Sequence, residues 1–297
     1  MRTILPEYYL KQWGMQDINK SEVQEVRLRI GQGVLLVRNG IEEELNTISL
    51  TRKDLEQIFQ WLCNYGAYAY QQDIAKGFIT IQGGHRIGIG GHASVNQLGE
   101  VTGMRYMSSL NIRVSHEVRG VSKAVLPYVI EDATLKNTLI LAAPGMGKTT
   151  MLRDLIKQIS DGTEFLSGRQ VSVIDEREEI AACFQGFPSH DLGKRTDIIS
   201  ACPKAMGMEM CLRSLGPQVV AIDEVYSESD IESLYKLLGC GCQIIATHHC
   251  GDFASFQKKS FGIAVMREHF FERYIVLGKQ DETYLVQGIY NDKGQYV

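Results

Sequence analysis

Residues 142–149 have the types and spacing of a nucleotide-binding loop. They read A-A-P-G-M-G-K-T, between an apolar run and an amphipathic segment. The phosphate-binding pattern G-x-x-x-x-G-K-[ST] occupies the same strand–loop–helix setting. Its backbone N–H groups surround the β-phosphate, its lysine neutralises the β- and γ-phosphates, and its hydroxyl binds Mg²⁺. We therefore predict that ATP and Mg²⁺ bind at Pro144, Gly145, Met146, Gly147, Lys148, Thr149 and Thr150.

Ala142 departs from this pattern, which has a glycine at that position. A Cβ is tolerated there if the backbone φ stays negative, but the departure weakens the match to the pattern. A chance glycine-rich turn is the alternative interpretation of the loop.

A second carboxylate site follows the apolar run at residues 218–222 and consists of Asp223 and Glu224. A strand of this kind must end beside the phosphate loop for its carboxylates to reach the Mg²⁺ and the attacking water. We predict that Asp223 binds the metal together with Thr149 and that Glu224 acts on the water. Acidic residues that merely cap a strand are the alternative.

Two further apolar runs end in polar residues. Residues 171–175 end at Asp175, which precedes Glu176 and Glu179, and residues 243–247 precede His248 and His249. Strand ends that meet at one sheet edge would supply a polarising acid and a γ-phosphate sensor. Solvated charges and a structural histidine are the alternatives.

Cysteines near these histidines raise the question of zinc. Cys240, Cys242 and Cys250 do not have the spacing of a zinc site. Seven irregularly spaced cysteines in a chain without an export signal indicate reduced thiols.

The elements that carry these residues predict an α/β C-terminal domain at residues 123–297. Four short apolar runs are typical of buried parallel strands, and an amphipathic helix follows the phosphate loop. Residues 273–290 predict a closing hairpin. The fold class is a RecA-like P-loop NTPase domain.

The preceding residues, 1–122, predict a smaller α+β domain. Residues 23–30 and 34–38 have the composition of strands, and a helix follows Thr51, which we expect to cap it. Residues 78–94 alternate around Gly83-Gly84, as a hairpin does. Residues 104–107 and 111–115 predict two further strands.

Composition limits the class of protein. A formal charge of −4 argues against nonspecific nucleic-acid binding as the main activity. The chain has no apolar run long enough to cross a membrane and no signal peptide at its start. We therefore expect a cytoplasmic protein.

The motifs together resemble the stage III sporulation protein AA family, a relative of the hexameric ATPases of type II and type IV secretion and pilus retraction. The similarity spans nearly the whole chain. It is carried by the segments EVRLRIG (25–31), GFITIQGGHRIGIGG (77–91), SSLNIRVS (108–115), APGMGKTT (143–150), VIDEREEIA (173–181), DLGKRTDIISACPKAMGMEMCLRSLGPQVVAIDE (191–224) and IIATHH (244–249).

The resemblance implies roles that spacing does not. The acidic box of the secretion ATPases corresponds to Asp175, Glu176 and Glu179. Their histidine box ends in a histidine that corresponds to His249, and the neighbouring His248 is the alternative. Glu224 matches their catalytic acid, whereas Asp223 replaces a glycine. Those hexamers also bring arginines from an N-terminal domain onto the nucleotide, for which the candidates are Arg86, Arg105 and Arg113.

The resemblance also implies a function: a hexameric ATPase, peripheral at the mother-cell side of the membrane, that drives the mother cell–forespore channel of endospore formers. Its expected partners are other stage III sporulation proteins, particularly the membrane protein AB. The alternatives are a monomeric P-loop kinase, a nucleotide-binding scaffold without turnover and a nucleic-acid motor. A GTPase is disfavoured because no N-K-x-D stretch follows the loop.

Overall fold

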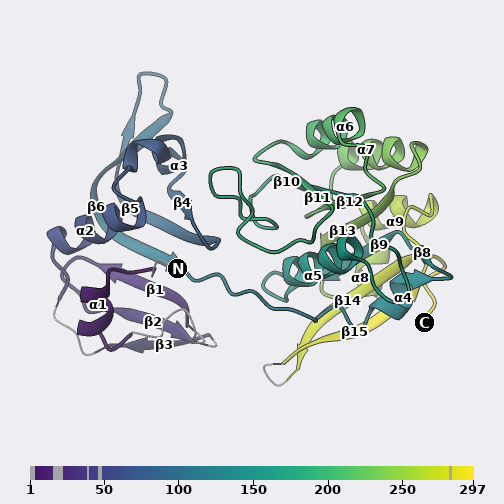
Figure 1. Ribbon diagram of the computed structural model, residues 1–297, viewed down its shortest axis with the longest axis horizontal. Helices are drawn as coiled ribbons and strands as arrows, with labels where there is room; N and C mark the ends of the chain where they lie inside the picture. Colours follow the sequence, from purple (N-terminus) through teal and green to yellow (C-terminus); the bar gives the residue numbers. More distant parts are fainter. Residues whose placement is uncertain (1–3, 16–22, 39, 46–48, 281–282) are drawn as a thin grey trace. The chain divides into compact units, whose positions relative to one another are not determined.

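The chain forms two units, each built around its own sheet (Figure 1). The structure is a computed structural model that describes residues 4–15, 23–38, 40–45, 49–280 and 283–297. The N-terminal unit comprises residues 1–116 and 184–189, and the C-terminal unit comprises residues 117–183 and 190–297.

The N-terminal unit contains a six-stranded antiparallel sheet in the order β3-β2-β1-β6-β5-β4. Its strands are β1 (Val23–Arg29), β2 (Leu35–Arg38), β3 (Ile41–Glu44), β4 (Phe78–Ile81), β5 (His85–Val95) and β6 (Val101–Arg113). Its helical segments are α1 (Glu7–Gln12), α2 (Arg52–Leu62), the 3₁₀ turn η1 (Ala67–Tyr70) and α3 (Gln71–Ala75).

Side-chain alternation creates the core of this unit. Val26 and Leu28 of β1 are buried, whereas Arg27 between them is only partly buried. Helix α2 contributes a buried face and begins at Thr51, where the predicted cap is present as a reciprocal pair with Asp54. Since one face of the sheet is apolar and the other polar, the register is set by burial.

The predicted hairpin at residues 78–94 is present as β4 and β5. The two strands predicted at residues 104–107 and 111–115 are instead one strand, β6, which pairs with both β1 and β5. The strand bends where Tyr106 adopts a positive φ of 47° and the register with β5 shifts near Gly90. A bend of this kind breaks the local alternation from which two separate strands were inferred.

The C-terminal unit contains a seven-stranded sheet in the order β11-β10-β12-β13-β9-β14-β15. All its pairs are parallel except the terminal hairpin β14–β15. The strands are β9 (Thr138–Ala142), β10 (Val171–Asp175), β11 (Thr196–Ser200), β12 (Val219–Ile222), β13 (Gln243–His249), β14 (Arg273–Gln280) and β15 (Thr283–Asn291). The predicted closing hairpin is present, and residues 281–282 at its turn lie outside the described residues.

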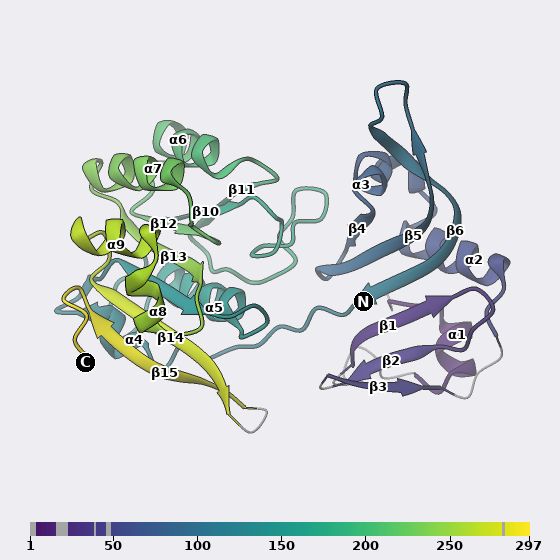
Figure 2. The same cartoon turned by 180° about the vertical axis from the view of Figure 1, so that it is seen from behind.

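Helices cover both faces of this sheet. On β9, Ile140 packs into the core formed with α5 (Lys148–Asp161), and Leu139 and Leu141 pack into the core on the opposite face. Figures 1 and 2 show the two helical layers from opposite sides. The helices of the opposite layer are α6 (Lys204–Ser214), α7 (Glu228–Gly239), α8 (Phe253–Lys258) and α9 (Ser260–Arg267). A short segment before β9 holds α4 (Leu126–Val129), β7 (Ile130–Glu131) and β8 (Thr134–Leu135).

The C-terminal unit begins after His116, earlier than the boundary expected at residue 122. The reason is the buried carboxylate of Asp154 on α5. It accepts hydrogen bonds from the Gly120 and Ser122 amides at 2.9 and 2.8 Å and from the Ser122 hydroxyl at 2.6 Å. These bonds tie the connecting segment to α5. Among the described residues, none of the helices combines the length and apolar character that a bilayer crossing requires.

Candidate functional site

The phosphate loop lies between β9 and α5. Gly147 is the N-cap of α5 with φ 82°, and Gly145 has φ 76°, so both positions need glycine. Pro144 and Met146 lie in the loop, while Lys148, Thr149 and Thr150 begin the helix. Ala142 is the last residue of β9 and is fully buried, without the positive φ that would require glycine there. An alanine is therefore compatible with the backbone at this position of the strand.

Four strands end at the edge where the loop lies. Strands β9, β10, β12 and β13 are parallel neighbours, so their carboxyl ends share one edge. This edge gathers the polar residues that follow each apolar run in the sequence. In an open α/β sheet, this is where ligands bind.

Thr149 and Asp223 form the candidate metal pair. The Thr149 hydroxyl donates to Asp223 Oδ2 at 3.3 Å, and the Thr247 hydroxyl donates to Asp223 Oδ1 at 2.5 Å. A hydroxyl and a carboxylate suit Mg²⁺, which is usually bound by one or two protein oxygens together with phosphates and waters. The donor set fits the ion that the sequence predicts.

Lys148, His249 and Glu224 form a chain of polar contacts. Lys148 Nζ lies 2.8 Å from His249 Nδ1, and His249 Nε2 lies 3.1 Å from Glu224 Oε1. An ammonium group only donates hydrogen bonds, so Nδ1 accepts and Nε2–H donates to the carboxylate. Burial lowers the pKa of Lys148, while Asp223, Glu224 and Glu179 act in the opposite direction. The predicted histidine therefore joins the loop lysine to Glu224, the predicted catalytic acid.

Two basic residues complete the surroundings of Glu224, and sequence reasoning assigned no role to either. Arg177 Nη1 pairs with Glu224 Oε2. Lys204 Nζ donates to the Glu224 carbonyl at 2.5 Å and lies 3.4 Å from Asp230 Oδ2. Arg177 lies in the DEREE segment (175–179) and Lys204 in the CPK segment (202–204). Both segments carry the family resemblance, which is the one sequence feature that could have pointed to these two residues. Only the sheet order brings them to Glu224.

The acidic stretch after β10 divides into different environments. Asp175 is buried, and its carboxylate accepts from the amides of Glu179, Ile180 and Ala181 at 2.8 to 3.1 Å. Burial raises the pKa of Asp175, and these amide bonds partly offset the effect. Glu176 lies 3.9 Å from Lys204, whereas Glu179 contributes to the electrostatics of Lys148. The geometry gives Asp175 a turn-forming contact. Within this stretch Glu179 acts on the loop lysine, after the larger effects of Asp223 and Glu224.

The two adjacent histidines also differ. His248 is buried, its Nδ1 donates to the Val225 carbonyl at 2.7 Å, and its ring stacks on Phe261 at 5.0 Å. It belongs to the core, and His249 is the histidine at the site. Nearby, the Cys242 thiol contacts the Pro217 carbonyl. Within the described residues, no group of three or more His, Cys, Asp or Glu side chains is arranged to hold a metal ion.

The three candidate arginines lie in the N-terminal unit. Arg86 stacks over the Phe78 ring at 3.7 Å, and Arg113 pairs with Glu25 at 3.3 Å. Arg105 is exposed on β6. The contacts of Arg86 and Arg113 are of the kind that surface arginines make.

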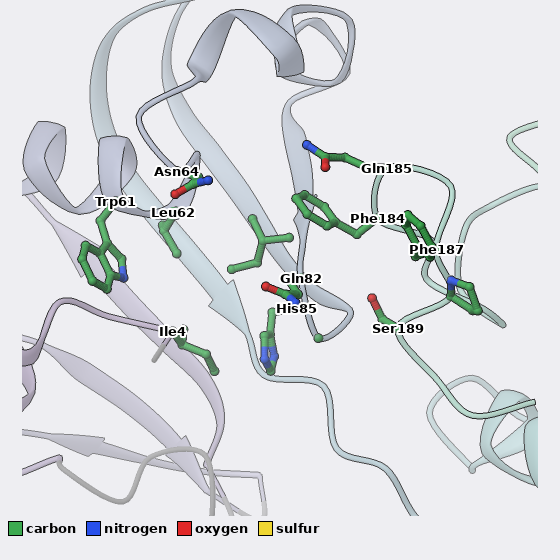
Figure 3. Close-up of a pocket in the computed structure, with 13 residues that line it drawn as sticks. Ile4, Trp61, Leu62, Asn64, Gln82, His85, Phe184, Gln185, Phe187 and Ser189 are labelled. Carbon is green, nitrogen blue, oxygen red and sulfur yellow. The ribbon is translucent and has the colours of Figure 1, made fainter. Parts of the chain in front are cut away.

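A cavity of about 480 Å³ also lies in the N-terminal unit (Figure 3). His85 and Gln82 line it from the β4–β5 hairpin, with Phe184 and Phe187 from the segment at residues 184–189. None of the predicted site residues lines it. We assign the functional site by its chemistry at the phosphate loop and not by cavity size.

Comparison with known proteins now places the chain. Residues 2–297 match the family described as sporulation stage III, protein AA. The chain belongs to this family. It is 35% identical to stage III sporulation protein AA of Bacillus subtilis (strain 168) over 294 residues, which covers 99% of this chain and 92% of that protein. The resemblance inferred from the motifs is confirmed.

Solved structures confirm the fold. The ATPase DotB of Legionella pneumophila superposes with a TM-score of 0.64 at 13% identity, covering 97% of this chain and 81% of that chain. The pilus retraction motor PilT with bound ADP gives the same TM-score at 13% identity, covering 97% and 82%. The predicted P-loop α/β fold is therefore correct. At this level of identity, the similarity is evidence for the fold only.

Proposed function

We propose that this protein is a Mg²⁺-dependent ATPase. The observation that carries the proposal is the convergence of three groups at one sheet edge. These are the Thr149–Asp223 pair, the loop lysine Lys148 and the acid Glu224, which His249 links to the lysine. Phosphate binding, metal binding and water activation each need one of these groups.

The residues suggest how hydrolysis proceeds. Lys148 and the N–H groups at the start of α5 bind the β- and γ-phosphates, and Thr149 with Asp223 holds Mg²⁺, which would neutralise phosphate charge. Glu224 accepts a proton from water as the water oxygen bonds to the γ-phosphorus. The bond from phosphorus to the bridging oxygen breaks, and its electron pair stays on ADP. The products are ADP, phosphate and a proton.

We further propose that the enzyme works as a ring, with six subunits as the expected number, at the mother-cell side of the membrane. It would drive a secretion-like complex that contains stage III sporulation protein AB. The family membership supports the sporulation role. The similarity to DotB, an ATPase, and to PilT, a retraction motor, supports the motor role.

The test is the Mg²⁺-dependent ATPase rate per subunit as protein concentration rises, with Lys148→Ala as the blank. We expect a specific rate that climbs and then saturates, because a site completed by a neighbour works only in the assembled ring. The blank should lose at least about a hundredfold in rate, since the lysine neutralises transferred charge.

The other outcomes select the alternatives. A flat, nonzero rate at all concentrations would contradict the ring and favour a self-contained kinase-like site. Tight ATP binding without turnover, even with the membrane partner added, would favour a nucleotide-binding scaffold. Stimulation by DNA that falls with added salt would favour a nucleic-acid motor.

A further inference from the structure

Both carboxylate oxygens of Glu224 are engaged. Oε2 pairs with Arg177, and Oε1 accepts from His249 at 3.1 Å. A carboxylate that accepts a proton from water needs one oxygen available to that water. The guanidinium and the imidazole therefore compete with water for the carboxylate, and release by one of them leaves an oxygen open to accept the proton.

The backbone of Glu224 is held in place, so the release involves side chains. Its N–H donates to the Thr247 hydroxyl at 2.8 Å, and its carbonyl accepts from Lys204 at 2.5 Å. Its φ is 59°, a left-handed conformation that is uncommon outside glycine. Contacts from two other elements maintain this conformation, because Thr247 lies on β13 and Lys204 begins α6.

Arg177 is the partner that can exchange. Its side chain is 53% exposed, whereas that of Glu224 is 17% exposed. It lies in the turn after β10, between Asp175 and Glu178, and Glu178 has a φ of 56°. A half-exposed ion pair contributes little net free energy, so a stronger anion can take the guanidinium. A γ-phosphate is such an anion, because arginine binds phosphate through two parallel hydrogen bonds.

We propose that Arg177 is a positioning residue that couples Glu224 to the γ-phosphate within one subunit. Paired with Arg177, the carboxylate is withheld from water. A γ-phosphate bound at Lys148 draws the guanidinium away and frees Oε2, so the acid acts only when ATP, and not ADP, is in place. This inference rests on the proposed ATPase function, and it assigns a nucleotide-sensing role to a residue of the phosphate-loop unit itself.

The experiment compares ADP with the non-hydrolysable β,γ-imido analogue of ATP, using calorimetric titration of the full chain with Mg²⁺. The readout is the ratio of the two affinities. Arg177→Ala should leave ADP binding unchanged and lower the preference for the triphosphate by about tenfold, the effect of one charge-assisted hydrogen bond. Arg177→Lys keeps the positive charge but loses the paired N–H donors of the guanidinium. Its preference for the triphosphate should lie between those of the wild type and Arg177→Ala.

Glu224→Gln tests the coupling. Removing the carboxylate charge frees Arg177, so the triphosphate preference should rise severalfold. In the double variant Arg177→Ala/Glu224→Gln this gain should vanish, because the gain depends on the freed Arg177 side chain. The matched control is Arg213→Ala, an exposed arginine on α6 that pairs with Glu209. It should match the wild type.

Two results would overturn the coupling. One is a triphosphate preference of Arg177→Ala within about twofold of the wild type. The other is a gain from Glu224→Gln that persists without Arg177. The titrations need no turnover, so they separate this inference from the proposed function. A wild type that binds both nucleotides but hydrolyses neither would reject the ATPase and leave the binding ratio as the test of Arg177.

Discussion

At the scale of single residues, the carboxylates near the loop differ by their partners more than by their chemistry. Asp175 holds three backbone amides, Asp223 faces two hydroxyls, and Glu224 faces a histidine and an arginine. A carboxylate bound to amides stabilises a turn, and one bound to side chains that can move is able to change partners. We therefore propose catalysis for Glu224 and a structural role for Asp175.

His85 provides a residue-scale prediction about pH in the N-terminal unit. It is 8% exposed, and its Nδ1 accepts from the Ser115 amide at 3.0 Å. Burial, and then the nearby His116, lower the pKa of His85 to about 4. The unfolded chain binds the proton near pH 6.5, so stability should fall as pH drops through the window from about 6.5 to about 4.

The measurement is urea unfolding followed by tryptophan fluorescence. Both tryptophans, Trp13 and Trp61, lie in the N-terminal unit, so the signal reports on that unit alone. Between about pH 7.5 and about pH 5, the wild type should lose about 2 kcal/mol more than His85→Asn, which keeps an acceptor but does not titrate. Equal losses in the two proteins would show that His85 is not the cause.

At the scale of elements, the corner between α8 and α9 supports the end of β13. Phe256 of α8 is buried against the His248 ring, and Lys259 at the corner donates to the His249 carbonyl at 2.9 Å. Gly262 on α9 lies where a Cβ would collide with the Phe256 carbonyl. The site histidine is thus positioned by a close approach of two short helices.

We predict that Gly262→Ala destabilises the C-terminal unit by about 1 to 3 kcal/mol, although alanine is the better helix former. The reason is overpacking against backbone, which cannot rotate away. The matched control is Gly239→Ala on α7, where a Cβ would meet nothing within 4 Å. It should be neutral or stabilise by up to about 1 kcal/mol. Amide hydrogen exchange of α8 and α9 is the measurement, and unchanged protection in Gly262→Ala would refute the predicted collision.

At the scale of the whole molecule, the proposed catalytic groups are divided between two units. The phosphate loop and Glu224 belong to the C-terminal unit, and the candidate arginines Arg86, Arg105 and Arg113 belong to the N-terminal unit. If one of these arginines acts on the nucleotide of a neighbouring subunit, each functional site combines residues of two chains. A ring offers this arrangement at every interface.

We predict that alanine at the functional arginine lowers turnover far more than ATP binding, because it acts on the transition state. Mixing this variant with Glu224→Gln should restore turnover from two nearly inactive proteins. In an equal random mixture, about one quarter of the sites would combine an intact acid with an intact neighbouring arginine. The measurement is the ATPase rate across mixing ratios.

A mixture of two variants of the C-terminal unit is the control for this experiment. Mixing Lys148→Ala with Glu224→Gln should restore nothing, because both residues belong to the C-terminal unit of one chain. If none of the three arginine variants complements Glu224→Gln, these arginines do not act between subunits.

Short segments of the chain were enough to predict the loop, the strands and the acids that follow them. Gly145, Gly147 and Lys148 are recognisable because a phosphate-binding loop is built from adjacent residues. Apolar runs such as 171–175 are recognisable because every residue of the strand is buried. Contacts within a few residues of the chain set these features. The family resemblance rested on the same segments.

Which of these residues come into contact depends on the order of the strands in the folded sheet. Arg177 reaches Glu224, and Lys204 holds its backbone, because β10 pairs with β12 and α6 packs on β10. The same order separates His248 in the core from His249 at the site. Strand order arises from the packing of both faces of the sheet at once, and the hydrophobic periodicity of a single segment does not reveal it. Residues of one charge type that lie close in sequence can therefore have different partners and different functions.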